Sequence, residues 1–211
     1  IAVRNARLLN ETNIHSRNLT LLYEAGLALN RELNPQSQIR TFFEIIVRGL
    51  KAENAVFFRY NEVAGDLHFE SGVGGNLDKE RLKQVRFPLG EARGLVGWVA
   101  KQRQPMYLAD VQSDPRWIKM GPKLRAVLWT PVEFENRLLG VLTVASLEVD
   151  AFSKQDQQLL ELFAHQIAIS MENARLFDVL RDELLERRQV EQSLRESEQR
   201  FRNLFENSPL A

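Results

Sequence analysis

The stretch from Arg137 to Leu176 constrains the fold more than any other part of the chain. It opens with a dense run of apolar and β-branched residues, which is typical of a buried strand. Ser153 and Asp156 then have the spacing of a helix N-cap, because a hydroxyl accepts from an orphan amide and an early acid suits the helix dipole. Apolar residues recur at helical spacing from there to Leu176. The stretch therefore predicts a buried strand that leads directly into a long amphipathic helix.

Three pieces of this stretch resemble, in order and spacing, the end of a GAF domain. They are Gly140-Val141-Leu142-Thr143-Val144, Phe152-Ser153-Lys154-Gln155-Asp156 and Glu172-Asn173-Ala174-Arg175-Leu176. A second ordered set upstream resembles the middle of the same family: Gly94-Leu95-Val96-Gly97-Trp98-Val99-Ala100, the segment 104–111, and Asp114-Pro115-Arg116-Trp117. The resemblance covers residues 33–176 and implies an α+β fold, with an antiparallel sheet flanked by helices.

Local patterns along the chain predict the same architecture. A helix is expected from Pro35 to Leu50, because proline suits a first helical position and the apolar residues that follow have helical spacing. Strands are expected at 55–60, 67–73, 85–89, 104–111, 125–134 and 137–147, with short helices at 78–83 and 94–100. Glu135 and Asn136 predict a tight hairpin between the last two strands. Strands that follow one another closely, with helices gathered elsewhere, indicate the α+β class.

Charge and composition narrow the classes of partner. Lys and Arg together number 28 and so do Asp and Glu, so no overall charge attracts nucleic acid or an anionic membrane. No apolar run has membrane-spanning length. Cysteine is absent, which excludes disulfides, thiolate catalysis and thiolate metal ligands in these residues. We expect a cytoplasmic protein with no metal, no cofactor, no nucleic-acid partner and no membrane contact within these residues.

The two ends of the chain predict connecting helices. Residues 1–33 are expected to form an N-terminal helix, 34–176 the GAF-like sensor domain, and 177–206 a charged linker helix. Apolar residues along that linker predict a parallel coiled coil with a second copy, through Leu176, Leu180, Leu184 and Leu194. The alternative is a solvated monomeric helix that folds back onto the domain. Residues 197–211 resemble the beginning of a PAS domain, so we interpret the chain as a piece of a longer signalling protein.

Aromatic side chains between residues 87 and 129 are suited to line a cavity against the sheet. We predict a ligand pocket lined by Phe87, Trp98, Tyr107, Asp110, Trp117 and Trp129. Further polar candidates are Arg93, Asp114 and Arg116. In the alternative interpretation the aromatic rings fill the space themselves, and Phe152 and Asp156 serve as a core side chain and a helix cap.

The resemblance can be tested against the chemistry of particular family members. Covalent bilin attachment and the GAF-like methionine sulfoxide reductases both require cysteine, which this chain lacks. The pattern of cyclic-nucleotide-binding members departs at Ser146-Leu147 and at Gln157. His165 weakly resembles a kinase phosphoacceptor, and a single histidine is also the minimum that haem requires. The surrounding residues favour a packing or surface histidine instead.

The interpretation that best fits these patterns is a regulatory sensor and dimerisation module of a bacterial signalling protein of the sensor kinase or cyclase type. Ligand or partner binding at the sheet is expected to bias two arrangements of the flanking helices. The alternative is a ligand-free spacer that holds a homodimer in register. We do not expect an enzyme, because no nucleophile with a neighbouring base and no phosphate-binding loop stands out.

Overall fold

The computed structural model describes residues 16, 18–27, 35–75, 77–89, 94–118 and 123–206, with only the backbone of 35–38 and 201–206. Most of the predicted N-terminal helix, Arg93 as a pocket residue, and the PAS-like residues after 206 lie outside the described residues. The chain divides into two units, Ile1–Ser170 and Met171–Ala211, each of which is described by itself.

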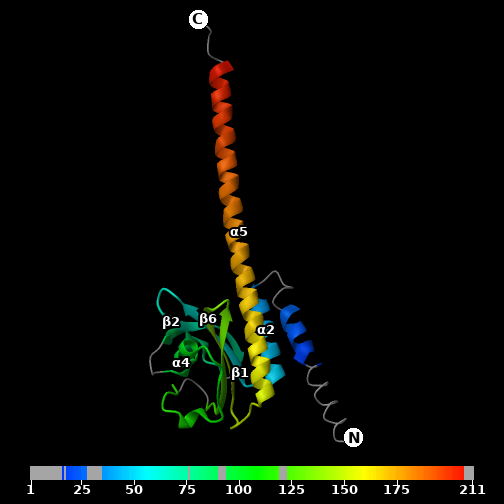
Figure 1. Cartoon of the computed structure of the whole chain (residues 1–211), viewed down its shortest axis with the longest axis vertical. Helices are drawn as coiled ribbons and strands as arrows, with labels where there is room; N and C mark the ends of the chain where they lie inside the picture. Colours follow the sequence, from blue (N-terminus) through cyan, green and yellow to red (C-terminus); the bar gives the residue numbers. More distant parts are fainter. Residues whose placement is uncertain are drawn as a thin grey trace. The chain divides into compact units, whose positions relative to one another are not determined.

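The first unit is built on an antiparallel sheet of six strands (Figure 1). The strands are β1 (Asn54–Asn61), β2 (Asp66–Gly74), β3 (Arg86–Pro88), β4 (Met106–Leu108), β5 (Ala126–Phe134) and β6 (Arg137–Ser146). Their order in the sheet is β3-β2-β1-β6-β5-β4. The first and last strands therefore pair with each other and form the centre of the sheet, while β3 and β4 form its edges.

The α-helices agree with the sequence predictions, but the strand expected at 104–111 is shorter, Met106–Leu108, because the chain turns into a 3₁₀ helix capped by Asp110. The helices are α2 (Pro35–Leu50), α3 (Lys79–Gln84), α4 (Leu95–Gln102), the short 3₁₀ helix Val111–Ser113, and α5 (Lys154–Glu206); residues 18–27 are also helical. The predicted cap of α5 is confirmed, since the Asp156 amide donates to the Ser153 hydroxyl oxygen at 3.2 Å. In return the Ser153 amide donates to the Asp156 carboxylate at 2.8 Å, so each residue satisfies an orphan amide of the other. The α+β class predicted from the sequence is confirmed.

One face of the sheet is covered by α2 and by the first part of α5 (Figure 1). The rings of Phe42 in α2 and Phe163 in α5 meet edge to face, with 5.9 Å between their centroids. The helical segment 18–27 lies outside α2, where Leu21 contacts Gly49 and Glu24 pairs with Arg48 at 2.6 Å. These contacts make the layer a hydrophobic core between the sheet and its helices.

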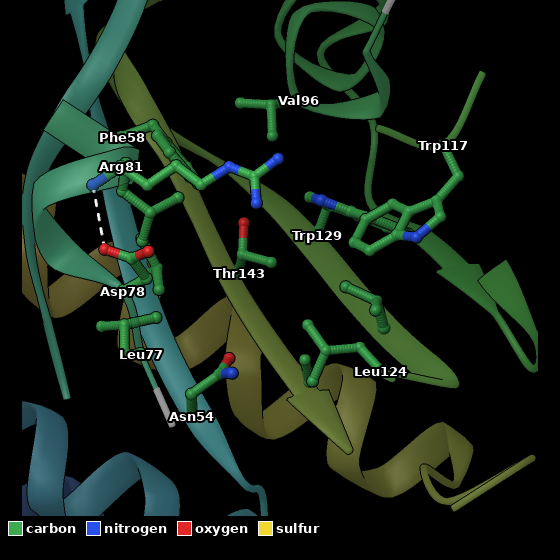
Figure 2. Close-up of a pocket in the computed structure, with 14 residues that line it drawn as sticks. Asn54, Phe58, Leu77, Asp78, Arg81, Val96, Trp117, Leu124, Trp129 and Thr143 are labelled. Carbon is green, nitrogen blue, oxygen red and sulfur yellow. Dashed lines mark hydrogen bonds between the residues drawn. The ribbon is translucent and has the colours of Figure 1, made fainter. Parts of the chain in front are cut away.

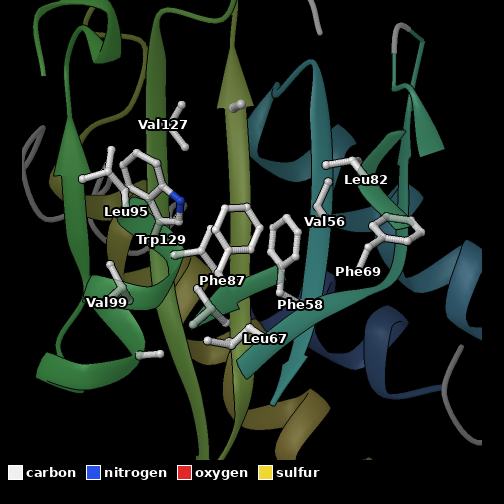
Figure 3. Close-up of a cluster of buried hydrophobic side chains, with 14 of the residues drawn as sticks. Val56, Phe58, Leu67, Phe69, Leu82, Phe87, Leu95, Val99, Val127 and Trp129 are labelled. Carbon is white, nitrogen blue, oxygen red and sulfur yellow. The ribbon is translucent and has the colours of Figure 1, made fainter. Parts of the chain in front are cut away.

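The opposite face carries a second hydrophobic cluster beneath α3 and α4 (Figure 3). Phe58 of β1 and Phe87 of β3 pack edge to face in this cluster, with 5.2 Å between centroids. Only 1% of the surface of Trp129 in β5 is exposed to solvent. A buried side chain of this size contributes about 1.5–3 kcal/mol or more through apolar area removed from water. The cluster therefore anchors the loops and short helices above the sheet.

Two backbone features explain the turn residues Glu135 and Asn136 and the motif glycine Gly140. Glu135 and Asn136 both have positive φ, 47° and 67°, which is the left-handed geometry of a two-residue hairpin turn between β5 and β6. A Cβ on Gly140 would lie 2.2 Å from the Phe58 carbonyl oxygen of the neighbouring strand. Only glycine allows β1 and β6 to approach this closely.

The second unit is the continuation of α5 beyond residue 170. Large apolar side chains are exposed along it, including Leu176, Leu180, Leu184 and Leu194. Each of these four keeps 46–59% of its surface exposed. Among the described residues, no helix is both long and apolar enough to cross a membrane.

Candidate functional site

A cavity lies over strands β1, β6 and β5, on the face of the sheet that carries α3 and α4, and its floor follows from strand register. Thr143 of β6 pairs with Val56 of β1 on one side and with Trp129 of β5 on the other. Ala145, two residues further along β6, pairs in the same way with Asn54 and Val127. Side chains two residues apart on a strand point to the same face, so these two rows form one continuous floor.

The walls come from the segments that cross above the sheet (Figure 2). Leu77, Asp78, Arg81 and Leu82 come from α3 and the residues before it, and Val96 comes from α4. The far side is closed by Trp117 and Leu124. The cavity has a volume of about 60 Å³. This volume is well below that of drug-sized pockets, so the cavity favours a small molecule.

Few polar groups reach this cavity, and one of them is unusual. The hydroxyl of Thr143 is buried and has no hydrogen-bond partner among the described residues. A buried hydroxyl without a partner costs about 1–3 kcal/mol, so its presence in the middle of the sheet requires a reason. Asn54, which is 3% exposed, supplies a second polar side chain to the floor.

The charged groups of the cavity lie at its α3 side. Asp78 is the N-cap of α3, and its carboxylate accepts from the Arg81 backbone amide at 3.0 Å. The side chain of Arg81 extends from that helix over the cavity, toward its centre (Figure 2). An acid at a helix start is stabilised by the helix dipole. The carboxylate of Asp78 therefore has a structural role, and the guanidinium of Arg81 is the cation that the site presents.

Two of the six predicted pocket residues line this cavity. The indole rings of Trp117 and Trp129 meet at 6.2 Å between centroids, with an angle of 65° between their planes. Phe87 lies instead in the buried cluster, against Phe58. Trp98 lies partly buried below Arg116, whose guanidinium carbon is 5.3 Å from the ring centroid. The sequence prediction thus identified one wall of the cavity and part of its floor.

Tyr107 and Asp110, the other two predicted residues, hold loops in place. The Tyr107 hydroxyl donates to Asp150 at 2.9 Å and accepts from the Phe152 amide at 3.3 Å, just before α5. Burial raises the pKa of this hydroxyl, so it remains a donor at neutral pH. Phe152 is itself 4% exposed and packs against the Tyr107 ring, as expected of a core side chain.

Asp110 forms a two-pronged ion pair. Its carboxylate accepts from Arg125 Nε at 3.0 Å and from Nη2 at 2.5 Å, and it also accepts from the Gln112 amide at 3.1 Å. The hydrogen bonds from Arg125 hold the pKa of Asp110 below its ordinary value. Asp114 and Arg116 form a similar pair at 2.6 Å. The first pair joins the loop after β4 to the start of β5, the second lies within that loop, and neither lines the cavity.

The cavity residues that the sequence analysis did not identify are mainly Arg81, Thr143 and Asn54. Thr143 carried a signal, because it is the one polar residue within the apolar run of β6. Arg81 lies in a short charged helix with no pattern that distinguishes it from its neighbours. Among the described residues, no group of three or more His, Asp or Glu side chains is arranged to hold a metal ion.

Comparison with known proteins agrees with the fold. A probable 3′,5′-cyclic phosphodiesterase of Caenorhabditis elegans is 24% identical over 122 residues, which are 54% of this chain but 16% of that protein. The GAF domain of a phosphoenolpyruvate-protein phosphotransferase from Coxiella burnetii has a TM-score of 0.69 at 21% identity, covering 78% of this chain and 98% of that one.

A free methionine-R-sulfoxide reductase from Neisseria meningitidis, solved in complex with its substrate, has a TM-score of 0.65 at 18% identity, over 75% of this chain and 90% of that one. At these identities the likeness to solved structures shows a shared fold. Residues 32–172, well over half of the chain, match the GAF domain family. The chain therefore belongs to the GAF domain family.

Proposed function

We propose that this GAF domain is a regulatory ligand-binding module of a bacterial signalling protein, and that the cavity over β1, β6 and β5 is its binding site. The observation that carries the proposal is the Thr143 hydroxyl, which is buried, unpaired among the described residues, and part of the cavity lining. Ligand pockets are mostly apolar with a few converging polar groups, and this cavity has that composition. The likeness to a substrate-bound reductase adds that the fold accommodates small molecules.

We propose a regulatory role because the described residues of the cavity lining include no nucleophile with a neighbouring base. These 211 residues contain no cysteine, so the thiol chemistry implied by the reductase resemblance is excluded. The one hydroxyl in the floor, that of Thr143, has no hydrogen-bond partner among the described residues and therefore no adjacent base. Binding without turnover is the chemistry that remains for this arrangement.

We also propose that the module is a homodimer joined through α5. Leu162, Ile169, Leu176 and Val190 fall on one series of seven-residue steps, and Leu180 and Leu194 fall on a second series four residues later. All six are at least 40% exposed. Two such series are the a and d positions of a coiled coil, and a second copy in parallel buries both. Binding at the cavity then reaches an output domain, of the kinase or cyclase type, through this paired helix.

A ligand-free spacer is the second candidate, and one observation favours it. Trp129 is almost fully buried, and the cavity of about 60 Å³ is well below the roughly 300–1,000 Å³ of drug-sized pockets. In that case the rings of Trp117 and Trp129 serve only to fill the domain. The ligand-binding proposal therefore requires a small ligand.

A thermal screen separates the two candidates. A ligand that binds only the folded protein raises its Tm by an amount that grows with ligand concentration. We expect a hit among small metabolites, and we expect Ala145→Ile, which fills the cavity from its floor, to abolish the shift. Lys79→Met, on the same side but outside the lining, is the matched control and should keep it. A screen without any shift supports the spacer.

A further inference from the structure

We infer that the ligand is a small aliphatic monocarboxylate, held by Arg81 and Thr143 with its hydrocarbon end against Trp117 and Trp129. The inference rests on the proposed ligand-binding function and specifies the chemical class that the cavity selects. Four observations carry it: the unpaired hydroxyl, the cation that extends over the cavity, the apolar lining, and the volume.

The unpaired hydroxyl identifies the polar end of the ligand. Thr143 is only 8% exposed, yet its hydroxyl oxygen has no hydrogen-bond partner among the described residues. A hydroxyl can donate one hydrogen bond, and a carboxylate oxygen is the acceptor that strengthens it most. Thr143 points into the cavity in Figure 2. A ligand acceptor at this point satisfies a group that the fold alone leaves unsatisfied.

The cation defines the charge of that acceptor. Arg81 lines the same cavity, and its guanidinium end extends over the floor that contains Thr143 (Figure 2). Guanidinium and carboxylate match in a planar, two-pronged geometry. Asp78 is the acidic group of the lining, but its carboxylate already accepts from the amide of α3. That negative charge disfavours a dianion such as phosphate more than it disfavours a monocarboxylate.

The rest of the lining is hydrocarbon, which defines the other end of the ligand. The apolar residues Val56, Val96, Val127, Leu124 and Ala145 line the cavity together with the two indole rings. A charged or strongly hydrated body would lose its water here without compensation. The small volume favours a short acid such as propionate or butyrate over a nucleotide. The volume and the lining therefore agree on a short aliphatic acid.

The tryptophans provide a direct test, because the chain has three and two of them line the cavity. In ¹⁵N-labelled protein the indole N–H signals of Trp117, Trp129 and Trp98 are followed during titration with sodium butyrate at constant ionic strength. We expect the indole signals of Trp117 and Trp129 to shift until they saturate. The signal of Trp98, which lies outside the cavity, should not shift. Butyramide, with the same shape and no charge, should bind about tenfold more weakly, because hydrogen bonds to a charged group are stronger.

Two substitutions assign the contacts. Arg81→Met keeps a long side chain and removes the charge, so butyrate should bind about tenfold more weakly or worse, and no better than butyramide. Thr143→Val should weaken butyrate binding several-fold while raising the Tm, which a merely structural threonine would not do. Lys79→Met is the control, because it also removes one positive charge from α3, but outside the cavity lining. Its affinity for butyrate should equal that of the original protein.

Each outcome decides the inference. Equal or tighter binding of butyramide overturns it, as does an Arg81→Met variant with undiminished butyrate affinity. Phosphate that binds as tightly as butyrate shows a general anion contact and also overturns it. If a ligand of another class from the thermal screen shifts Trp117 and Trp129 while butyrate does not, the carboxylate inference fails and the proposed function stands. If no compound shifts either indole, both fail.

Discussion

Replacing Thr143 by valine should stabilise this protein, although most substitutions in a protein core destabilise it. The two side chains have nearly the same shape, so the change removes only the buried hydroxyl. Thr143 is 8% exposed, and its hydroxyl oxygen is buried without a hydrogen-bond partner among the described residues. Valine at this position removes an unsatisfied group and keeps the strand packing of Val56 and Trp129 on either side.

The expected gain follows from two contributions. Leaving a buried hydroxyl unpaired costs about 1–3 kcal/mol, and valine no longer has that penalty. The additional methyl group contributes up to about 0.8 kcal/mol of apolar burial. We therefore expect the free energy of unfolding to rise by about 1–3 kcal/mol. For a domain of this size, each kcal/mol raises the Tm by about 2–4 °C.

Urea unfolding followed by tryptophan fluorescence measures this difference, at one fixed protein concentration and with the slope m compared between variants. Ser146 supplies the matched control on the same strand. It is also 8% exposed, but its hydroxyl accepts from the Glu148 amide at 3.1 Å. Ser146→Ala should therefore lower the free energy of unfolding by about 1 kcal/mol.

A loss of stability in the Thr143→Val variant would refute this reasoning. If Thr143→Val destabilises the protein as much as Ser146→Ala does, the threonine hydroxyl has a partner, such as an ordered water, that compensates its burial. Thr143 would then no longer indicate a ligand acceptor, and the assignment of the cavity's polar end would have to be withdrawn.

Three further perturbations test other parts of the account. Leu180→Glu should convert a micromolar dimer to monomer in sedimentation, whereas the off-seam change Gln189→Glu should not; a monomeric original protein contradicts the coiled coil. The pKa of Asp110 is held below its ordinary value of 3.8 by Arg125, so the pair stabilises above about pH 4 and is lost as pH falls through the lowered pKa. Asp110→Asn should thus destabilise at pH 7 and flatten the acid dependence of the unfolding midpoint; parallel profiles for both proteins would contradict the pairing. Gly140→Ala should cost about 3 kcal/mol in urea unfolding, because its Cβ meets a carbonyl oxygen at 2.2 Å, and Gly75→Ala, whose Cβ meets nothing closer than 3.7 Å, should be tolerated.

The elements of this fold were predictable because their signals are local. The Ser153–Asp156 cap and the Glu135-Asn136 turn depend on residues a few positions apart, and both are found as expected. The pairing of β1 with β6 depends on residues more than 80 positions apart, such as Asn54 and Ala145. No local pattern encodes that pairing, and the resemblance to the GAF family supplied only the fold class.

The cavity was predicted only in part for a related physical reason. Aromatic size suggested a lining role for Tyr107 as well as Trp117, but a hydroxyl and a neighbouring acid placed Tyr107 in a loop network with Asp150. Asp110 was a plausible polar contact until its pairing with Arg125 became visible. Arg81 and Thr143 lie more than 60 positions apart and meet at one cavity through the register of β6 and the position of α3. Such convergence is a property of the fold and has no counterpart in sequence spacing.

The central claim is that occupancy of the cavity changes the helix that leaves the domain. Hydrogen exchange across the whole chain, with and without the compound that raises the Tm most (butyrate by our inference), tests it directly. If the domain is a sensor, the compound should alter amide protection at β1, β5 and β6 and also along α5, Lys154–Glu206. In the Ala145→Ile variant, whose cavity is filled, the compound should cause neither change. Protection that changes around the cavity while α5 exchanges as before would contradict the claim and leave a domain that binds a ligand without passing its state to the helix.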